Sequence, residues 1–485
     1  MSDRPIRFER IALDVVVCHL DFIPDLVSSV EVVDLPGPYA LLESGVGRGH
    51  SYLCAGEESQ PFEIPGDWPG SADPGSAIAE LRNRFSENCA DEARRAMTRR
   101  FPSIFTGGGV GFFSYDFART LERLPETARD DLELPHARLF FPSTVLVADH
   151  ERGRSLLIVR RDRKLNDVDV DAIELRARSL VERLAGLPRH TVPVPHALGR
   201  MDEPSVPSGY GASMSRDEFI SIVDRAREYI REGDIFQANL SLRLSTPYDG
   251  RPIDLYIVLR ELNPSPYMTL LEFDDLAVVG ASPEQLLRVS GREIATRPIA
   301  GTRRRGRTAE EEEEKERELL ASEKERAEHL MLVDLERNDI GRVAAYGSVT
   351  VDEFMTLERY SHVVHIVSNV IGRLSDQSDR FDALGALFPG GTITGAPKVR
   401  AMEIIDELEP VRRGIYTGAI GWIGYGPMLE LNIAIRSILL RNGSAWLQGG
   451  AGIVADSVGE LEYRESLKKL AAAIAAVEEG RSRGK

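Results

Sequence analysis

Short apolar runs typical of strands alternate with helical stretches along this chain, without a repeated strand–helix–strand rhythm. The runs at 143–150 (STVLVADH), 276–281 (LAVVGA) and 437–441 (SILLR) indicate strands. Helical spacing of apolar residues predicts one long helix over 310–335 and a last helix over about 460–478. A regular alternation would favour a doubly wound parallel sheet. Its absence predicts an α+β fold.

A stretch rich in Pro, Gly and Ser, 186–214, interrupts the pattern and shows no sustained helical or strand period. We interpret it as a linker or a long surface loop. It divides the chain into a region over 1–190 and a denser region over 210–480. In the first region, the segment 107–116 (GGGVGFFSYD) is interpreted as a glycine-rich turn.

The charge balance excludes some partners. The formal net charge of the 485 residues is −17, which opposes general binding to nucleic acids or anionic membranes, because both reward excess Lys and Arg. No apolar run approaches the roughly 18 to 20 residues that a membrane helix needs. The first residues are charged where a secretory signal would be apolar. Cys18, Cys54 and Cys89 lack metal-like spacing and are too few for a disulfide framework. We therefore expect a cytoplasmic protein.

The loop 389–398 (PGGTITGAPK) precedes a helical run, VRAMEIIDELE. Its glycines permit close backbone approach, and Pro397 suits the first turn of a helix. Exposed N–H groups at a helix start attract anions, and Lys398 adds a full positive charge. The loop is not a Walker loop, and an ordinary helix-entry turn is the alternative reading. An apolar stripe is expected at Val399, Met402, Ile405 and Leu408.

Two acidic pairs have helical spacing. Glu325 and Glu328 lie three residues apart in one predicted helix, and Glu462 and Glu465 lie three apart in another. Each pair therefore shares a helix face. Carboxylates from two helices, with positions left for water and substrate oxygens, are what Mg2+ prefers. Surface charge patterns are the alternative, since nothing local shows that the helices meet.

Two single residues could carry proton chemistry. Glu284, in GASPEQLL, follows a strand-like run and a Ser-Pro turn. A partly desolvated carboxyl there could hold a raised pKa and protonate a leaving hydroxyl. His365 lies in the apolar run YSHVVHIVSN, where a histidine is more often a satisfied core residue.

Several long motifs, taken together, resemble the chorismate-binding enzymes. This family comprises component I of anthranilate synthase and of aminodeoxychorismate synthase, and the isochorismate and salicylate synthases. The motifs are RPIAGT (297–302), AEHLMLVDLERNDIGRV (327–343), GTITGAPKVRAMEIIDELEP (391–410), RGIYTGAIGWIG (413–424), LNIAIRS (431–437) and GGAGIVADS (449–457). The resemblance runs almost unbroken from about 215 to 475, and more weakly through LLES (41–44) and 111–135. It implies a two-part α+β structure with large antiparallel sheets flanked by helices.

The resemblance also implies roles for single residues. Glu284 matches the general acid that assists loss of the C4 hydroxyl, and Glu328 and Glu465 match Mg2+ ligands. His365 and Thr392 match residues that line the substrate ring. Contacts to the substrate carboxylates are implied for Gly301, Thr302, Tyr416, Arg436, Gly450, Ala451, Gly452 and Lys469, with Lys398 nearby. Chorismate is a dianion with a poor leaving group, so such a site must bind carboxylates, supply Mg2+ charge and protonate departing hydroxide.

The nucleophile is expected to be ammonia. Relatives that add water carry a Lys base where Gln237 stands in GDIFQANLS, and glutamine is a poor base. A glutaminase would need a nucleophilic Cys with a His partner, and no cysteine of this chain lies in a tight glycine-rich turn. We therefore expect a separate glutamine amidotransferase subunit to supply ammonia.

The product is expected to be 4-amino-4-deoxychorismate, with anthranilate as the alternative. Asn239, GGTITGAPK and LNIAIRS favour the first. Ala300 favours the second, because many aminodeoxychorismate synthases carry a nucleophilic Lys at that position. A possible tryptophan pocket, known in anthranilate synthases and in some aminodeoxychorismate synthases, matches Ser44, Pro266, Tyr267 and Met268.

Overall fold

Two large antiparallel sheets form the centre of the molecule in this computed structural model, which describes residues 6–12, 14–33, 36–68, 75–89, 92–164, 170–193, 204–306, 308–360 and 363–483. The larger sheet contains, in spatial order, β1 (Arg7–Ala12), β2 (Val15–Leu20), β9 (Arg154–Arg160), β8 (Thr144–Asp149), β4 (His50–Ala55), β3 (Tyr39–Glu43), β12 (Tyr267–Glu272), β13 (Leu276–Ser282), β22 (Ser437–Arg441), β23 (Ser444–Ile453), β11 (Gln237–Pro247) and β10 (Gly211–Ala212), with β19 (Gly395–Ala396) paired to β11.

The smaller sheet has the order β16 (Ile299–Arg304), β18 (Val363–Arg373), β15 (Glu293–Arg297), β14 (Gln285–Ser290), β21 (Met428–Ile433), β20 (Ala419–Gly424), β6 (Gly108–Phe113), β7 (Ala137–Phe141) and β5 (Ser59–Ile64), with β17 (Thr350–Arg359) paired to β18. The helices are α1 (Leu26–Val33), α2 (Ser76–Cys89), α3 (Glu92–Arg100), α4 (Val170–Ala185), α5 (Arg216–Glu232), α6 (Pro252–Leu262), α7 (Ala309–Ala321), α8 (Glu323–Gly341), α9 (Arg380–Leu387), α10 (Lys398–Leu408) and α11 (Gly459–Arg483), with 3-10 turns η1 (Tyr115–Thr120) and η2 (Gly391–Ile393).

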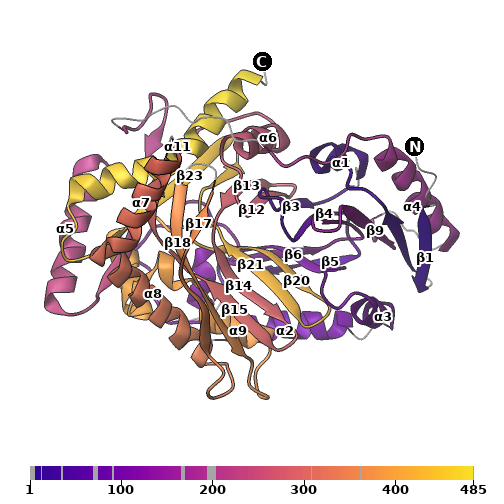
Figure 1. Cartoon of the computed structure of the whole chain (residues 1–485), viewed down its shortest axis with the longest axis horizontal. Helices are drawn as coiled ribbons and strands as arrows, with labels where there is room; N and C mark the ends of the chain where they lie inside the picture. Colours follow the sequence, from indigo (N-terminus) through magenta and orange to yellow (C-terminus); the bar gives the residue numbers. More distant parts are fainter. Residues whose placement is uncertain are drawn as a thin grey trace.

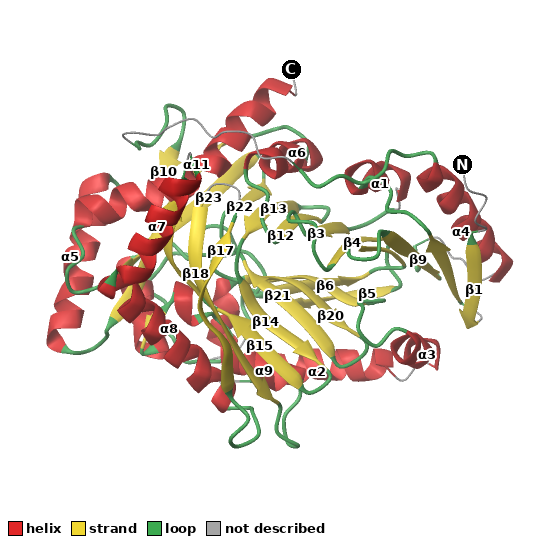
Figure 2. Ribbon diagram, viewed as in Figure 1, coloured by secondary structure: helices red, strands yellow, loops and turns green. Residues whose placement is uncertain are grey.

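The two sheets pack face to face, and helices cover their outer faces (Figures 1 and 2). One core cluster joins both sheets, for example Val147 and Val278 from the larger sheet with Phe112 and Ile420 from the smaller. A second core lies between the larger sheet and α1, α4, α5, α6 and α11. A third lies between the smaller sheet and α2, α8, α9 and α10. This layered arrangement confirms the predicted α+β class.

Strands from the two predicted regions are neighbours in both sheets. β3 pairs with β12, where Leu42 lies opposite Thr269. β6 pairs with β20, where Phe112 lies opposite Ile420. Part of the proposed boundary, 194–203, lies outside the described residues. The division into 1–190 and 210–480 stays a prediction about the chain, but the regions share their sheets.

Two local predictions were wrong. The segment 310–335 is not one helix, because Ser322 adopts extended backbone and separates α7 from α8, with its hydroxyl accepting from the Glu325 N–H. The serine therefore caps a new helix, as N-cap serines do. The glycine-rich segment 107–116 is not a turn but contains β6. A Cβ at Gly111 would overlap the Arg138 carbonyl of β7, so this glycine permits close strand packing.

The first apolar residues of α11 and α10 are exposed, and the prediction that Val399 is part of a buried stripe was wrong. Leu461 is 61% exposed, whereas Leu467, Leu470 and Ile474 of α11 are buried. Val399 is 37% exposed in the first turn of α10. None of the helices within the described ranges is both long and apolar enough to cross a bilayer.

Candidate active site

Glu284 occupies the short connection between β13 of the larger sheet and β14 of the smaller sheet. Its side chain is 5% exposed, and the N–H of Ile299 donates to Oε1 at 3.4 Å. Burial raises the pKa of Glu284 to about 7, while Thr392, the Ile299 N–H and the charges of Arg436 and Lys469 act in the opposite direction. A carboxyl with such a pKa retains a proton near neutrality and can donate it.

Arg436 lies between β21 and β22, with a positive φ of 52°, which is uncommon for a residue with a side chain. Its carbonyl is held by the Ala281 N–H at 3.1 Å. Burial lowers the pKa of Arg436, and the charges of Glu284 and Tyr360 act the other way. Glu284 acts on Arg436 through its charge and not through a hydrogen bond, and Arg436 forms no ion pair among the described residues. A desolvated cation without a partner carboxylate is suited to an anionic ligand.

His365 lies in β18 opposite Thr302 of β16. Its Nδ1 is 2.9 Å from the Thr302 hydroxyl and 3.3 Å from the Gly301 carbonyl. Its Nε2 is buried and has no hydrogen-bond partner in the described part of the chain. Burial, followed by the charge of Arg436, lowers the pKa of His365 to about 3. The imidazole is therefore neutral, and a carbonyl contact at Nδ1 leaves Nε2 as an acceptor.

The same two lysines, Lys324 and Lys469, act on an acid of each pair. The pKa of Glu328 is raised by burial and by the charge of Glu325, and lowered by Lys324 and Lys469. The pKa of Glu462 is raised by burial and by Glu465, and lowered by Ser457 and the same two lysines. Helices α8 and α11 therefore bring their acids to one place.

Glu465 is less enclosed than Glu328, because its side chain is 54% exposed. Lys469 Nζ lies 3.1 Å from Glu465 Oε1 and donates to the Gly450 carbonyl at 2.9 Å. The described residues do not present three acidic, histidine or cysteine side chains gathered as a complete metal cage. The donor chemistry nevertheless fits Mg2+, which takes one or two carboxylates and keeps several waters. The mutual repulsion of the acids would be relieved by such a cation.

Strands β11 and β23 place glycines beneath Gln237. A Cβ at Gly452 would overlap Gln237 Nε2, and one at Gly450 would overlap the Leu240 carbonyl. Gln237 Nε2 donates to Glu328 Oε1 at 3.2 Å, and its Oε1 is buried without a partner among the described residues. Ala451 is fully buried in the core, so only its backbone can face a ligand.

Three further predicted residues, Thr392, Tyr416 and Lys398, differ in whether their polar groups already have partners in the protein. Thr392 Oγ1 is buried and lacks a hydrogen bond of regular geometry to any described atom, although Thr392 lowers the pKa of Glu284. Tyr416 is buried, and the guanidinium carbon of Arg413 lies 5.7 Å from the centroid of the Tyr416 ring. Lys398 Nζ is already engaged, 2.6 Å from Asp339 Oδ2 and 3.1 Å from the Leu387 carbonyl. Its ammonium therefore neutralises a protein carboxylate, and its predicted substrate contact remains a prediction.

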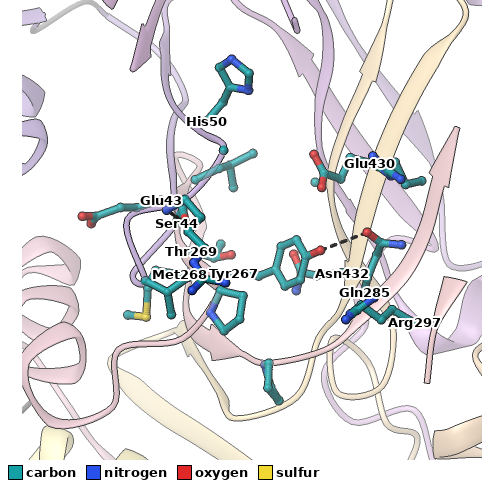
Figure 3. A pocket seen from close by; sticks show the side chains of 18 of the residues that line it. Glu43, Ser44, His50, Tyr267, Met268, Thr269, Gln285, Arg297, Glu430 and Asn432 are labelled. Atoms are coloured by element: carbon teal, nitrogen blue, oxygen red, sulfur yellow. Dashed lines mark hydrogen bonds between the residues drawn. The ribbon is translucent and has the colours of Figure 1, made fainter. Parts of the chain in front are cut away.

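A cavity of about 1030 Å³ lies beside this cluster and is lined in part by Gln285, the residue after Glu284 (Figure 3). It is lined by Ser44, Pro266, Tyr267 and Met268, the predicted tryptophan-pocket residues. The Tyr267 ring points across the cavity, and its hydroxyl donates to Gln285 Oε1 at 3.1 Å.

The sequence reasoning missed several polar residues of this wall, which come from β14, β15, β17 and β21: Gln285, Arg297, Glu358, Glu430 and Asn432. The position of Gln285 directly after Glu284 was the one available signal, because neighbouring strand residues face opposite sides. The others are brought together only by pairing of strands distant in sequence.

Comparison with known proteins identifies the family of the chain. Residues 51–475 match the family described as chorismate binding enzyme. Aminodeoxychorismate synthase component 1 of Bacillus subtilis is 49% identical over 370 residues, covering 76% of each chain. Anthranilate synthase component 1 of Mycobacterium bovis is 42% identical over 447 residues, covering 90% of this chain and 84% of that relative.

The fold also resembles those of solved structures. The crystal structure of anthranilate synthase component I from Streptococcus pneumoniae superimposes with a TM-score of 0.67 and 31% identity, covering 97% of this chain and 94% of that one. The Escherichia coli isochorismate synthase MenF, at 18% identity and a TM-score of 0.67, supports the fold alone. The predicted anthranilate synthase component I-like fold is therefore confirmed, and the chain belongs to the chorismate-binding enzyme family as a chorismate-using enzyme.

Proposed function

We propose that this enzyme aminates chorismate with ammonia to give 4-amino-4-deoxychorismate, on the route to p-aminobenzoate and folate. The observation that carries the proposal is the partly buried cation Arg436, which forms no described ion pair and lies near a buried carboxyl, Glu284, whose pKa is about 7. Arg436 would bind a substrate carboxylate, while Glu284 would protonate the departing C4 hydroxyl. His365 Nε2 and Thr392 Oγ1 would provide polar contacts along the ring.

Mg2+ is proposed as the cofactor, held by Glu328 and Glu465. When bound, the ion would neutralise substrate charge and act as a Lewis acid. Glu325 and Glu462, one helical turn away, would hold its waters. Gln237 orients Glu328 through their 3.2 Å hydrogen bond, which is a contact of the kind that tunes metal ligands.

Ammonia is proposed to come from a separate glutamine amidotransferase subunit. Burial raises the pKa of Cys18 to about 12 and raises the pKa of Cys54 as well, so neither thiol suits a glutaminase nucleophile. The side chain of Cys89 lies outside the described residues. The designation "component 1" of the Bacillus subtilis relative supports a second component for this chain too.

Anthranilate remains the alternative product, and Ala300 is the observation that favours it. Ala300 is buried in β16 opposite Ile366, so no amine is available there for covalent attack on the substrate. Several similar relatives are anthranilate synthases.

Product identification separates the two activities. Purified protein is incubated with chorismate, Mg2+ and isotopically labelled ammonium, and the products are identified by mass. A labelled product that retains the pyruvyl group supports the proposal. Anthranilate fluorescence without any added lyase would replace it with the alternative.

Tryptophan is proposed as a ligand of the cavity of about 1030 Å³. Its indole would lie against Pro266, Tyr267 and Met268, and Ser44 would offer a hydroxyl. Titration of the protein with tryptophan, followed by calorimetry, tests this assignment. A Ser44→Ala variant that binds tryptophan as tightly as the wild type would contradict the contact at Ser44.

A further inference from the structure

A buried acid, Glu336, lies behind the loop that carries Thr392 and has no role in the reaction outlined above. It projects from α8 and is 3% exposed. Its Oε1 accepts the N–H of Gly391 at 3.3 Å. Its Oε2 is also buried and has no hydrogen-bond partner among the described residues. The carboxyl is thus enclosed, and one of its oxygens accepts a hydrogen bond from the backbone of the loop that contains Thr392.

The loop rests directly on α8 at this point. A Cβ at Gly391 would overlap the side chain of Leu335, the residue before Glu336. Gly391 begins the turn η2, which contains Thr392, and the Thr394 hydroxyl closes this turn by donating to the Gly390 carbonyl at 2.9 Å. A movement of Gly391 relative to α8 would therefore displace Thr392.

The charges around Glu336 favour its neutral form. Burial, followed by the charge of Asp339 and with a contribution from Glu284, raises the pKa of Glu336 to about 8, against an opposing effect of Lys398 and the Gly391 N–H. Asp339 lies one turn further along α8 and holds Lys398 at 2.6 Å. The ionisable groups that act on Glu336 thus come from its own helix, from α10 and from the β13–β14 connection. Burial raises the pKa of Asp339 as well, but Lys398 lies against Asp339 and not against Glu336, which favours the charge on Asp339 and the proton on Glu336.

We propose that Glu336 is a positioning residue: as a neutral acid it holds the Gly391 N–H and so keeps Thr392 against Glu284. This inference rests on the proposed amination of chorismate. A neutral acid can accept the N–H without placing another negative charge beside a site for a dianion. Ionisation of Glu336 would add that charge, so substrate binding should weaken when it occurs.

Two variants separate the hydrogen bond from the charge. Glu336→Gln keeps an acceptor for Gly391 and is neutral at every pH, whereas Glu336→Leu removes the acceptor. Chorismate consumption, with ammonia and Mg2+, is measured as kcat and KM from about pH 6.5 to 9, whatever the product. Thermal unfolding of each variant checks that it is folded.

At neutral pH, the Gln variant should stay within about twofold of the wild type. The Leu variant should lose about tenfold in kcat with little change in KM, the scale of one buried N–H left without a partner. Above about pH 8, the KM of the wild type should rise more steeply than that of the Gln variant.

Each contrary result is distinct. Wild-type kcat in a folded Leu variant would overturn the positioning role. A Gln variant as impaired as the Leu variant would show that the charge is needed, and would overturn the neutral-acid role. If the Leu variant does not fold, identical pH profiles of KM in the wild type and the Gln variant would also overturn it. A wild type that consumes no chorismate would instead defeat the proposed function.

Discussion

The catalytic cluster and the large cavity lie on opposite sides of one short stretch of chain, where Glu284 faces the first and Gln285 faces the second. In the cluster, polar atoms lack protein partners, as at His365 Nε2. In the cavity, several polar groups are already paired: Tyr267 bonds Gln285, and Arg297 is paired with Glu358 and Glu353.

This difference teaches what each site requires of a ligand. A ligand of the cluster can complete groups that lack a partner, such as His365 Nε2. A polar ligand of the cavity must replace hydrogen bonds or ion pairs that already exist within the protein. Its binding can therefore move the residues that make them. The first arrangement suits catalysis, and the second suits a ligand whose binding displaces side chains around it.

The largest effect is expected at the centre of the cluster. Glu284→Gln should lower kcat by about 10²-fold or more, since it removes the proton donor, with KM changed by less than about twofold. Steady-state kinetics with chorismate, ammonia and Mg2+ measure both constants. Glu430→Gln is the matched control, because Glu430 is a carboxyl of the cavity whose burial also raises its pKa. An equal loss in the control would break the distinction between the two sites.

The next effect concerns the proposed metal ligands. Glu328→Gln and Glu465→Gln should each remove most of the activity, about tenfold or more, and weaken the response to Mg2+, because each removes a charged ligand. The measurement is the rate as a function of Mg2+ concentration. Glu318→Gln serves as the control, since Glu318 is an exposed acid on α7. Wild-type rates in both ligand variants would refute the metal assignment.

The pH dependence of the reaction rate should follow the ionisation of Glu284. Its pKa is raised to about 7, and only the protonated form can donate, so the rate should fall as the pH rises through 7, by about tenfold per unit once the acid is ionised. Rates are compared at equal concentrations of free NH3, because the nucleophile itself increases with pH. A rate that stays constant from about pH 6 to 9 after this correction would contradict the acid role.

The smallest effect should arise in the cavity. Tyr267→Phe removes the hydroxyl that bonds Gln285, a neutral hydrogen bond of about 1 kcal/mol. Basal kcat should change by less than about twofold, and tryptophan should still bind, but it should inhibit chorismate turnover less strongly. Inhibition curves for the variant and the wild type test this. Unchanged inhibition would show that the Tyr267–Gln285 bond does not connect the two sites.

Local patterns failed where packing between distant segments decided the outcome. The glycines of 107–116 suggested a turn, yet Gly111 permits close approach of β7. The apolar period across 310–335 concealed the break at Ser322, although Ser322 and Glu325 have the Ser-x-x-Glu spacing of a helix start. Lys398 suggested an anion site, but the fold places Asp339 against it.

The sequence alone determined the α+β class, the family and the candidate residues, since long motifs in a fixed order survive without knowledge of contacts. Only the tertiary structure decided their surroundings. Burial of Glu284, the lack of a described ion pair at Arg436 and the shared lysines of α8 and α11 all depend on segments far apart in the chain. A pKa follows from desolvation and neighbouring charge, and both are properties of the folded surroundings rather than of a motif.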